Sequence, residues 1–234
     1  MLTQNMNIHH FVYHSYANRE SRIKGLLAVL EDFDIVALQE VFVFNTPLMG
    51  NVGTFGRQSI LDHWKHHYAV PPSPPLLQQD SGLMILSKYP ILQTWSLSFD
   101  HRGPTEYLSQ KGALMAKIEV GDKKVNVITT HLDARSAAVR ALQVDQIVDQ
   151  FLHKTLGLGD GETEEGCILV GDLNSNPMKS GYSAAISYFA DSQDEFVKVS
   201  QKLDPLKEVR SQGGIPYERT MAFNVCLALH TMSM

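Results

Sequence analysis

Four apolar residues, Cys-Ile-Leu-Val at positions 167–170, run directly into Gly171, Asp172 and Asn174. A strand that is apolar on both faces has to be covered on both sides, by helices or by a second sheet. This run therefore predicts a layered α/β domain with a buried strand at positions 167–170. Burial does not explain why a carboxylate and an amide follow the strand so closely.

The overall composition narrows the class of protein. A chain of 234 residues with 44% apolar side chains predicts one layered domain over residues 1–234. The net charge of -5 provides no general attraction to nucleic acid, so a nucleic-acid partner is not expected. The first residues do not read as a secretory signal, and no apolar run reaches membrane-spanning length. Only Cys167 and Cys226 occur, which favours a reducing compartment and a cytoplasmic or peripheral-membrane location over a disulfide framework.

Helical and strand patterns alternate along the chain. Ile23, Leu26, Leu27 and Leu30 have the spacing of one helix face. The other expected elements are a strand at 34–40, an irregular surface segment at 45–80, a strand at 83–86, a hairpin at 112–131 turning at Gly-Asp-Lys-Lys, and helices at 136–152 and 180–190. After about residue 192 the pattern weakens.

Polar residues follow three of the expected strands. Glu40, His131, and Asp172 with Asn174 each come where an apolar run ends. Strand ends meet at one edge of a sheet, so these side chains are expected to converge. A carboxylate suits Mg²⁺, a histidine can donate to a phosphoryl oxygen, and an aspartate can orient water. The set predicts metal-assisted hydrolysis of a phosphate ester.

Each of these residues also has a purely structural interpretation. Glu40 can be a solvated residue at the start of a loop, and His131 can be a hydrogen-bonded histidine of a turn or the core. Asp172 and Asn174 can form an Asx turn after the strand, since both side chains readily bond nearby backbone. Their joint occurrence favours the site.

The motifs "LTQNM", "VALQEVF", "TTHLDA" and "LVGDLNSNP" occur in this order. Together they resemble the endonuclease/exonuclease/phosphatase superfamily with its DNase I-like fold, from residue 2 to about residue 180. The resemblance implies a four-layer αββα sandwich with mixed sheets.

Within this superfamily the chain is most similar to the neutral sphingomyelinases, through "DSGLMILSKYPI" and "SQKGALMAKI". This resemblance implies Mg²⁺-dependent hydrolysis of sphingomyelin, a phospholipid at a membrane surface, to ceramide and phosphocholine. It also implies a role for each site residue. Asn5 and Glu40 would lie at the Mg²⁺ site, His131 at the scissile phosphate, and Asp172 with Asn174 at the attacking water and the phosphate oxygens. Lys111 would shape the headgroup pocket, and its alternative is an exposed lysine at a strand start.

The chain departs from the superfamily pattern at its end. Members carry a final Ser-Asp-His motif, and no such motif follows Asn174 here. His230 lies between Leu229 and Thr231, so the role is not transferred to it. The sandwich is thus expected to be incomplete at its C-terminus, with its last strands missing and one sheet edge bare. Two alternatives follow, a nuclease or other phosphoesterase of the same superfamily, and a noncatalytic form that binds metal or a lipid headgroup.

The segment 45–80 is also the candidate membrane contact. Aromatic and aliphatic side chains suit the bilayer interface, and the segment contains Phe55, Trp64, Tyr68, Leu76 and Leu77. Alternatively, these residues pack the segment onto the sandwich.

Overall fold

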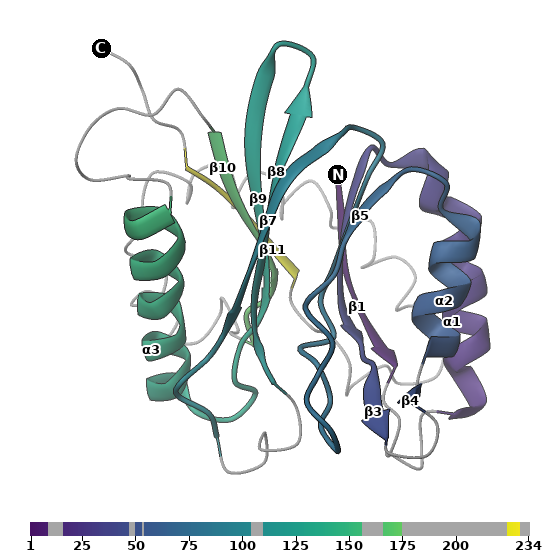
Figure 1. Ribbon diagram of the computed structural model, residues 1–234, viewed down its shortest axis with the longest axis horizontal. Helices are drawn as coiled ribbons and strands as arrows, with labels where there is room; N and C mark the ends of the chain where they lie inside the picture. The colour runs from purple at the N-terminus through teal and green to yellow at the C-terminus, as the bar shows by residue number, and fades with distance from the viewer. Residues whose placement is uncertain are drawn as a thin grey trace, which may run out of the picture.

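Two β-sheets pack face to face with helices on both outer sides (Figure 1). The computed structural model describes residues 1–8, 16–46, 50–52, 54–103, 110–155, 166–174 and 224–229. The four layers run from α3 through the two sheets to α1 and α2, which confirms the αββα sandwich (Figure 1).

The first sheet has the strand order β1-β2-β6-β5. Strands β1 and β2 are parallel, and β6 is antiparallel to both β2 and β5. The strands are β1 (Leu2–Ile8), β2 (Ile35–Val41), β5 (His67–Ala69) and β6 (Met84–Ser87). Helix α1 (Tyr16–Val29), continued by the 3-10 turn η1 (Leu30–Asp32), covers the outer face together with α2 (Thr54–His63). Ile23, Leu26 and Leu30 are buried against this face, as their spacing predicts.

The second sheet has the order β11-β10-β9-β8-β7. Only the β9–β10 pair is parallel. The strands are β7 (Ile91–Ser98), β8 (Gly112–Val120), β9 (Lys123–His131), β10 (Gly166–Asp172) and β11 (Asn224–Leu229). Alternate residues of β8 and β10 point to opposite faces, so that Met115 and Leu169 face α3 while Leu114 and Val170 pack between the sheets. Each sheet therefore contributes to two apolar cores.

Part of the segment 45–80 is regular, which corrects the expectation of an irregular excursion. It contains the hairpin of β3 (Phe44–Thr46) and β4 (Gly50–Val52), helix α2, and β5. Gly56 of α2 lies close to β1, and a Cβ there would be 3.1 Å from the Ile8 side chain. Ile60 and Trp64, four residues apart, are buried beneath the helix. Among the described residues of this segment, 64–66 and 70–80 have no helix or extended strand.

Two other expectations require smaller corrections. The β8–β9 hairpin turns on two residues, because Val120 pairs with Lys123 and Gly121 takes φ +66°. The helix expected at 136–152 is α3 (Ala137–Ile147) followed by π-helical turns (η2, Val148–Thr155). Ser136 caps α3 by accepting a hydrogen bond from Val139 N at 3.3 Å.

Strand β10 is not the edge of its sheet, because β11 takes that position. Strand β11 pairs antiparallel with β10 over six residues, from Cys167 opposite Leu229 to Asp172 opposite Asn224. Cys167 is a buried free thiol. The helix expected at 180–190 and His230 lie outside the described residues. No helix in the described part of the chain has both the length and the apolar character needed to cross a bilayer.

Candidate active site

The predicted site residues come from the ends of four strands in two sheets. Asn5 and Glu40 belong to the parallel pair β1 and β2, in which Asn5 is opposite Gln39. His131 and Asp172 end the parallel pair β9 and β10 and lie directly opposite each other. Because the two strands of each pair run in the same direction, their C-terminal ends lie side by side at the same end of the sheet. The packing of the two sheets brings these two sets of strand ends together.

The Asn5 side chain joins the two sheets. Its Nδ2 atom donates to Glu40 Oε1 at 2.9 Å and to Asp172 Oδ2 at 2.8 Å. The amide oxygen accepts from Asn7 N at 2.9 Å, which fixes the direction in which the amide points. Glu40 and Asp172 are both buried, and Asp172 is only 2% exposed. Two buried carboxylates therefore share one donor atom.

His131 lies beside the same carboxylate pair. Its Nε2 atom is 3.7 Å from Glu40 Oε1 and 3.7 Å from Asp172 Oδ2. These distances are longer than a hydrogen bond but within ion-pair range. The side chain is buried, which agrees with both interpretations of His131, and its position beside the two carboxylates supports the site.

Lys111 is buried next to His131. Its Nζ atom is 3.3 Å from His131 Nε2 and donates to Leu132 O at 2.8 Å. The alternative of an exposed lysine at a strand start is therefore wrong, although Lys111 does directly precede β8. A buried ammonium group beside two buried carboxylates partly balances their charge.

Asp172 and Asn174 form an Asx turn, as their purely structural interpretation predicts. Asn174 N donates to Asp172 Oδ1 at 3.0 Å, and the side-chain Nδ2 donates to Leu132 O at 2.8 Å. The other carboxylate oxygen of Asp172 remains directed at Asn5. The turn and the site therefore coexist, because each uses a different oxygen of the same carboxylate.

Backbone conformation is unusual at three of these loop ends. Asn7, Glu40 and Asn174 have φ of 49°, 60° and 48°. Non-glycine residues rarely adopt this left-handed region, and such residues concentrate at functional sites. Glu40 adopts this conformation near the end of β2, a strand in which every residue is buried. No sequence pattern indicates this strain at Glu40.

Sequence reasoning missed the buried pair that supports Glu40. Arg57 Nη2 is 2.7 Å from Asp80 Oδ2, and the Arg57 guanidinium also donates to Val41 O at 2.6 Å. Asp80 Oδ1 accepts from Val43 N at 3.0 Å and from Gly82 N at 3.1 Å. The contacts to Arg57 and Asp80 thereby hold Val41 and Val43, which follow Glu40, in place. The only signal was a carboxylate before a glycine at the start of an apolar run.

Gln39, the neighbour of Glu40, was also missed. Its side chain is fully buried between the sheets, where Nε2 donates to Thr129 Oγ1 at 3.0 Å and to Thr3 Oγ1 at 3.1 Å. It links β2 to both β1 and β9 next to the site.

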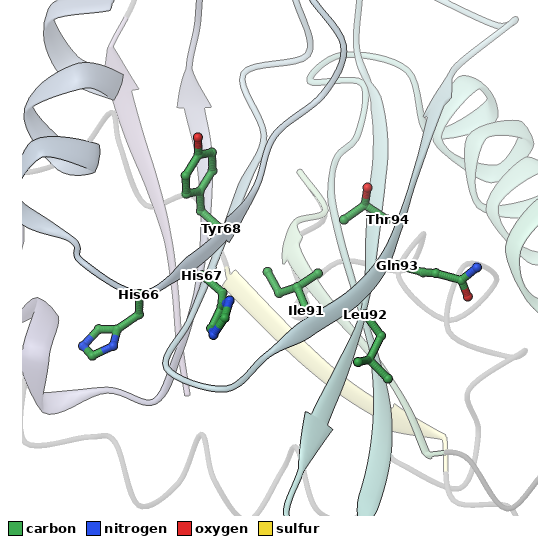
Figure 2. A pocket seen from close by; sticks show the side chains of 7 residues that line it. All are labelled: His66, His67, Tyr68, Ile91, Leu92, Gln93 and Thr94. Carbon is green, nitrogen blue, oxygen red and sulfur yellow. The ribbon is translucent and has the colours of Figure 1, made fainter.

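A pocket elsewhere on the molecule involves none of the predicted active-site residues. It has a volume of about 440 Å³ and lies between β5 and β7, the open edges of the two sheets (Figure 2). His67 pairs with Ser87, which also pairs with Ile35 at the start of β2. The pocket therefore lies at the opposite end of β2 from Glu40. It is lined by His66, His67, Tyr68, Ile91, Leu92, Gln93 and Thr94.

Comparison with known proteins places the chain in a defined group. Residues 3–223 match the model of the Endonuclease/Exonuclease/phosphatase family. A sphingomyelinase of Dictyostelium discoideum is 26% identical over 200 residues, which cover 70% of this chain and 42% of that protein. Sphingomyelinase C of Bacillus cereus is 28% identical over 182 residues, covering 70% and 52%. The chain thus spans about half the length of the curated relatives it matches.

Solved structures show the same fold. Sphingomyelinase C from Streptomyces griseocarneus superposes with a TM-score of 0.64 at 21% identity, over 80% of this chain and 68% of that one. A beta toxin double mutant from Staphylococcus aureus, solved with bound magnesium ions, gives a TM-score of 0.66 at 20% identity, over 80% and 68%.

Proposed function

The chain belongs to the Endonuclease/Exonuclease/phosphatase family, and we propose that it is a Mg²⁺-dependent phosphodiesterase that hydrolyses sphingomyelin to ceramide and phosphocholine. The observation that carries the proposal is the Asn5 amide, which holds the Glu40 and Asp172 carboxylates together beside His131. The names of the curated relatives support the choice of substrate.

The donor set around Asn5 fits a magnesium ion. Burying two carboxylates that face one atom is costly without a nearby cation. Carboxylate and amide oxygens are hard ligands, the kind that bind Mg²⁺. Among the described residues, no three His, Cys, Asp or Glu side chains are arranged to hold a metal alone. This suits Mg²⁺, which keeps several waters and completes its shell with substrate phosphate. Asn5 and Glu40 are the residues proposed to hold it; Asn5 would bind through Oδ1, so its amide has to turn from the orientation in which Oδ1 accepts from Asn7 N.

The remaining residues are assigned to the phosphodiester. Asp172 accepts a hydrogen bond from the attacking water and orients it toward phosphorus. His131 donates a hydrogen bond to a phosphoryl oxygen, whose negative charge grows in the transition state. Asn174 supplies its amide to a phosphate oxygen, and the Lys111 ammonium balances the same charge from the headgroup side. When bound, Mg²⁺ would polarise a phosphoryl oxygen.

The reaction forms one bond and breaks another at phosphorus. The water oxygen bonds to phosphorus, the bond from phosphorus to the ceramide oxygen breaks, and that oxygen receives a proton. The proton comes from the attacking water, so the step balances.

The substrate also defines the proposed partner, which is a membrane surface that the chain contacts peripherally. A cytoplasmic or peripheral-membrane location remains part of the proposal.

Phosphocholine release from sphingomyelin vesicles tests the proposed function. The purified chain should release phosphocholine with Mg²⁺ and not with EDTA, and Glu40→Gln should abolish the release. Plasmid DNA in place of vesicles distinguishes a nuclease. Mg²⁺ binding by calorimetry without release from either substrate would favour the noncatalytic alternative.

A further inference from the structure

Leu76 and Leu77 are two adjacent, strongly exposed leucines. Their exposed fractions are 56% and 58%, the highest among the large apolar side chains of the described residues. Single exposed leucines are common on protein surfaces, but an adjacent pair at the tip of a turn needs an explanation. Of the aromatic residues expected to join them at a membrane contact, Trp64 is buried and therefore packs the segment onto the sandwich.

The turn that carries the leucines is held in one conformation. Gln78 N donates to Pro75 O at 3.1 Å, which closes a four-residue turn with Leu76 and Leu77 at its centre. Leu77 has φ +61°, a conformation that suits glycine or asparagine and disfavours leucine. Leu77 is therefore strained, and strained residues concentrate at functional sites.

Asn45 fixes the turn from below. Its Nδ2 donates to Pro74 O at 2.9 Å, and its backbone oxygen accepts from Leu77 N at 2.8 Å. Four prolines between residues 71 and 75 further restrict the preceding chain. The leucines therefore project from a rigid support, which reduces the entropy lost when they bind.

The same support connects the turn with the candidate active site. Backbone hydrogen bonds link Val41 to Gly82, Val43 to Asp80 and Asn45 to Gln78 in succession. These paired segments begin one residue after Glu40 and end at the turn. Asn45 is five positions after Glu40 in the sequence, so the two residues are at most about 17 Å apart along an extended chain. The short hairpin β3–β4 lies at the end of the sandwich toward which β1 points (Figure 1).

We propose that Leu76 and Leu77 insert into the apolar region of a lipid bilayer and bring the Glu40 end of the sandwich to the membrane surface. This inference rests on the proposed function, since a bilayer lipid as substrate requires such a contact. Residues 69–79 carry no charged side chain, and the chain as a whole carries a net charge of -5. The contact is therefore apolar and does not depend on anionic lipid.

Sedimentation with phosphatidylcholine vesicles tests the contact separately from catalysis, because these vesicles contain no sphingomyelin. The double variant Leu76→Ser/Leu77→Asn removes both apolar side chains and places an asparagine at the left-handed position, so folding is preserved. Its melting temperature should equal or exceed that of the unmodified chain. Vesicle binding should weaken about tenfold or more.

Two exposed leucines elsewhere provide matched controls. Leu92→Ser on β7 and Leu142→Ser on α3 should bind as the unmodified chain does. Binding of the unmodified chain should resist 0.5 M NaCl and should not require phosphatidylserine. Absent binding, equal binding by the double variant, or binding that requires phosphatidylserine would overturn the assignment. So would concentration-dependent dimerisation that the double variant abolishes, since the pair would then contact a second copy.

The two proposals fail in different ways. Vesicle binding through the leucines without phosphocholine release contradicts the proposed function and supports the membrane contact. Phosphocholine release with no effect of the double variant on vesicle binding contradicts the membrane contact alone.

Discussion

Asn5 and Asp172 are 167 residues apart in sequence, and the amide nitrogen of Asn5 donates to the Asp172 carboxylate across the two sheets at 2.8 Å. The same nitrogen donates to Glu40. Asn5→Ala leaves two buried carboxylates without their shared donor, so the free energy of unfolding without Mg²⁺ should fall by about 1–3 kcal/mol. Urea unfolding in EDTA measures this change. Gln93→Ala, at an exposed amide on β7, is the control and should change stability by less than about 0.5 kcal/mol.

Removing the charge of Lys111 should lower activity more than stability. Lys111→Met keeps the apolar stem but removes the ammonium group that lies 3.3 Å from His131 Nε2. We expect kcat for phosphocholine release to fall about 100-fold, the scale on which one charged donor at a developing charge contributes. Lys124→Met, at an exposed lysine on β9, should leave kcat unchanged. Equal kcat in both variants would exclude Lys111 from the site.

Breaking the Arg57–Asp80 pair should be strongly destabilising. Asp80→Asn leaves the Arg57 guanidinium buried without its carboxylate, and we expect a loss of about 3–5 kcal/mol by urea unfolding. The surface pair between Lys88 and Asp34, 3.7 Å apart, is the contrast. Lys88→Ala should cost at most about 1 kcal/mol. Similar losses of unfolding free energy in the two variants would show that the buried pair stabilises the protein no more than the surface pair does.

Gly171 should not tolerate a side chain. Its φ is +139°, and a Cβ would lie 2.1 Å from Thr130 O on the neighbouring strand. Gly171→Ala should therefore destabilise the protein by more than about 1 kcal/mol and displace Asp172, which lowers activity as well. Gly25→Ala, within α1 and with no atom near the added methyl group, should instead stabilise by up to about 1 kcal/mol. Thermal unfolding of both variants provides the comparison.

Burial raises the pKa of the Cys167 thiol to about 12. In the unfolded chain the thiol ionises near pH 9, whereas in the folded chain it stays neutral up to about pH 12. Stability from this group is therefore complete below pH 9 and is lost as the pH rises from 9 toward 12, by at most about 1.4 kcal/mol per pH unit. In a Cys226→Ser background, a disulfide reagent at pH 8 should label Cys167 only in denaturant. Rapid labelling of the folded chain would contradict this burial.

The positions of the strand ends could be predicted because each apolar run stops where polar side chains begin. His131 and Asp172 each close such a run, and their strands prove to be adjacent and in register. Two of the three residues missed near Glu40, Arg57 and Asp80, had no comparable signal. Arg57 and Asp80 belong to segments that look like loop, and only packing brings them together. Helix α2 was missed because Gly56, which permits close packing on Ile8, resembles a turn residue in the sequence.

The bridge formed by Asn5 gives the site a second physical role. Asn5 and Glu40 belong to one sheet and His131 and Asp172 to the other, so the site exists only while the two sheets are docked. A cation bound between them would favour the docked state by mass action, by about 2.7 kcal/mol at a hundredfold excess over its Kd. A divalent cation would then hold the two sheets together, and the free energy of unfolding of the whole chain would rise with the cation concentration.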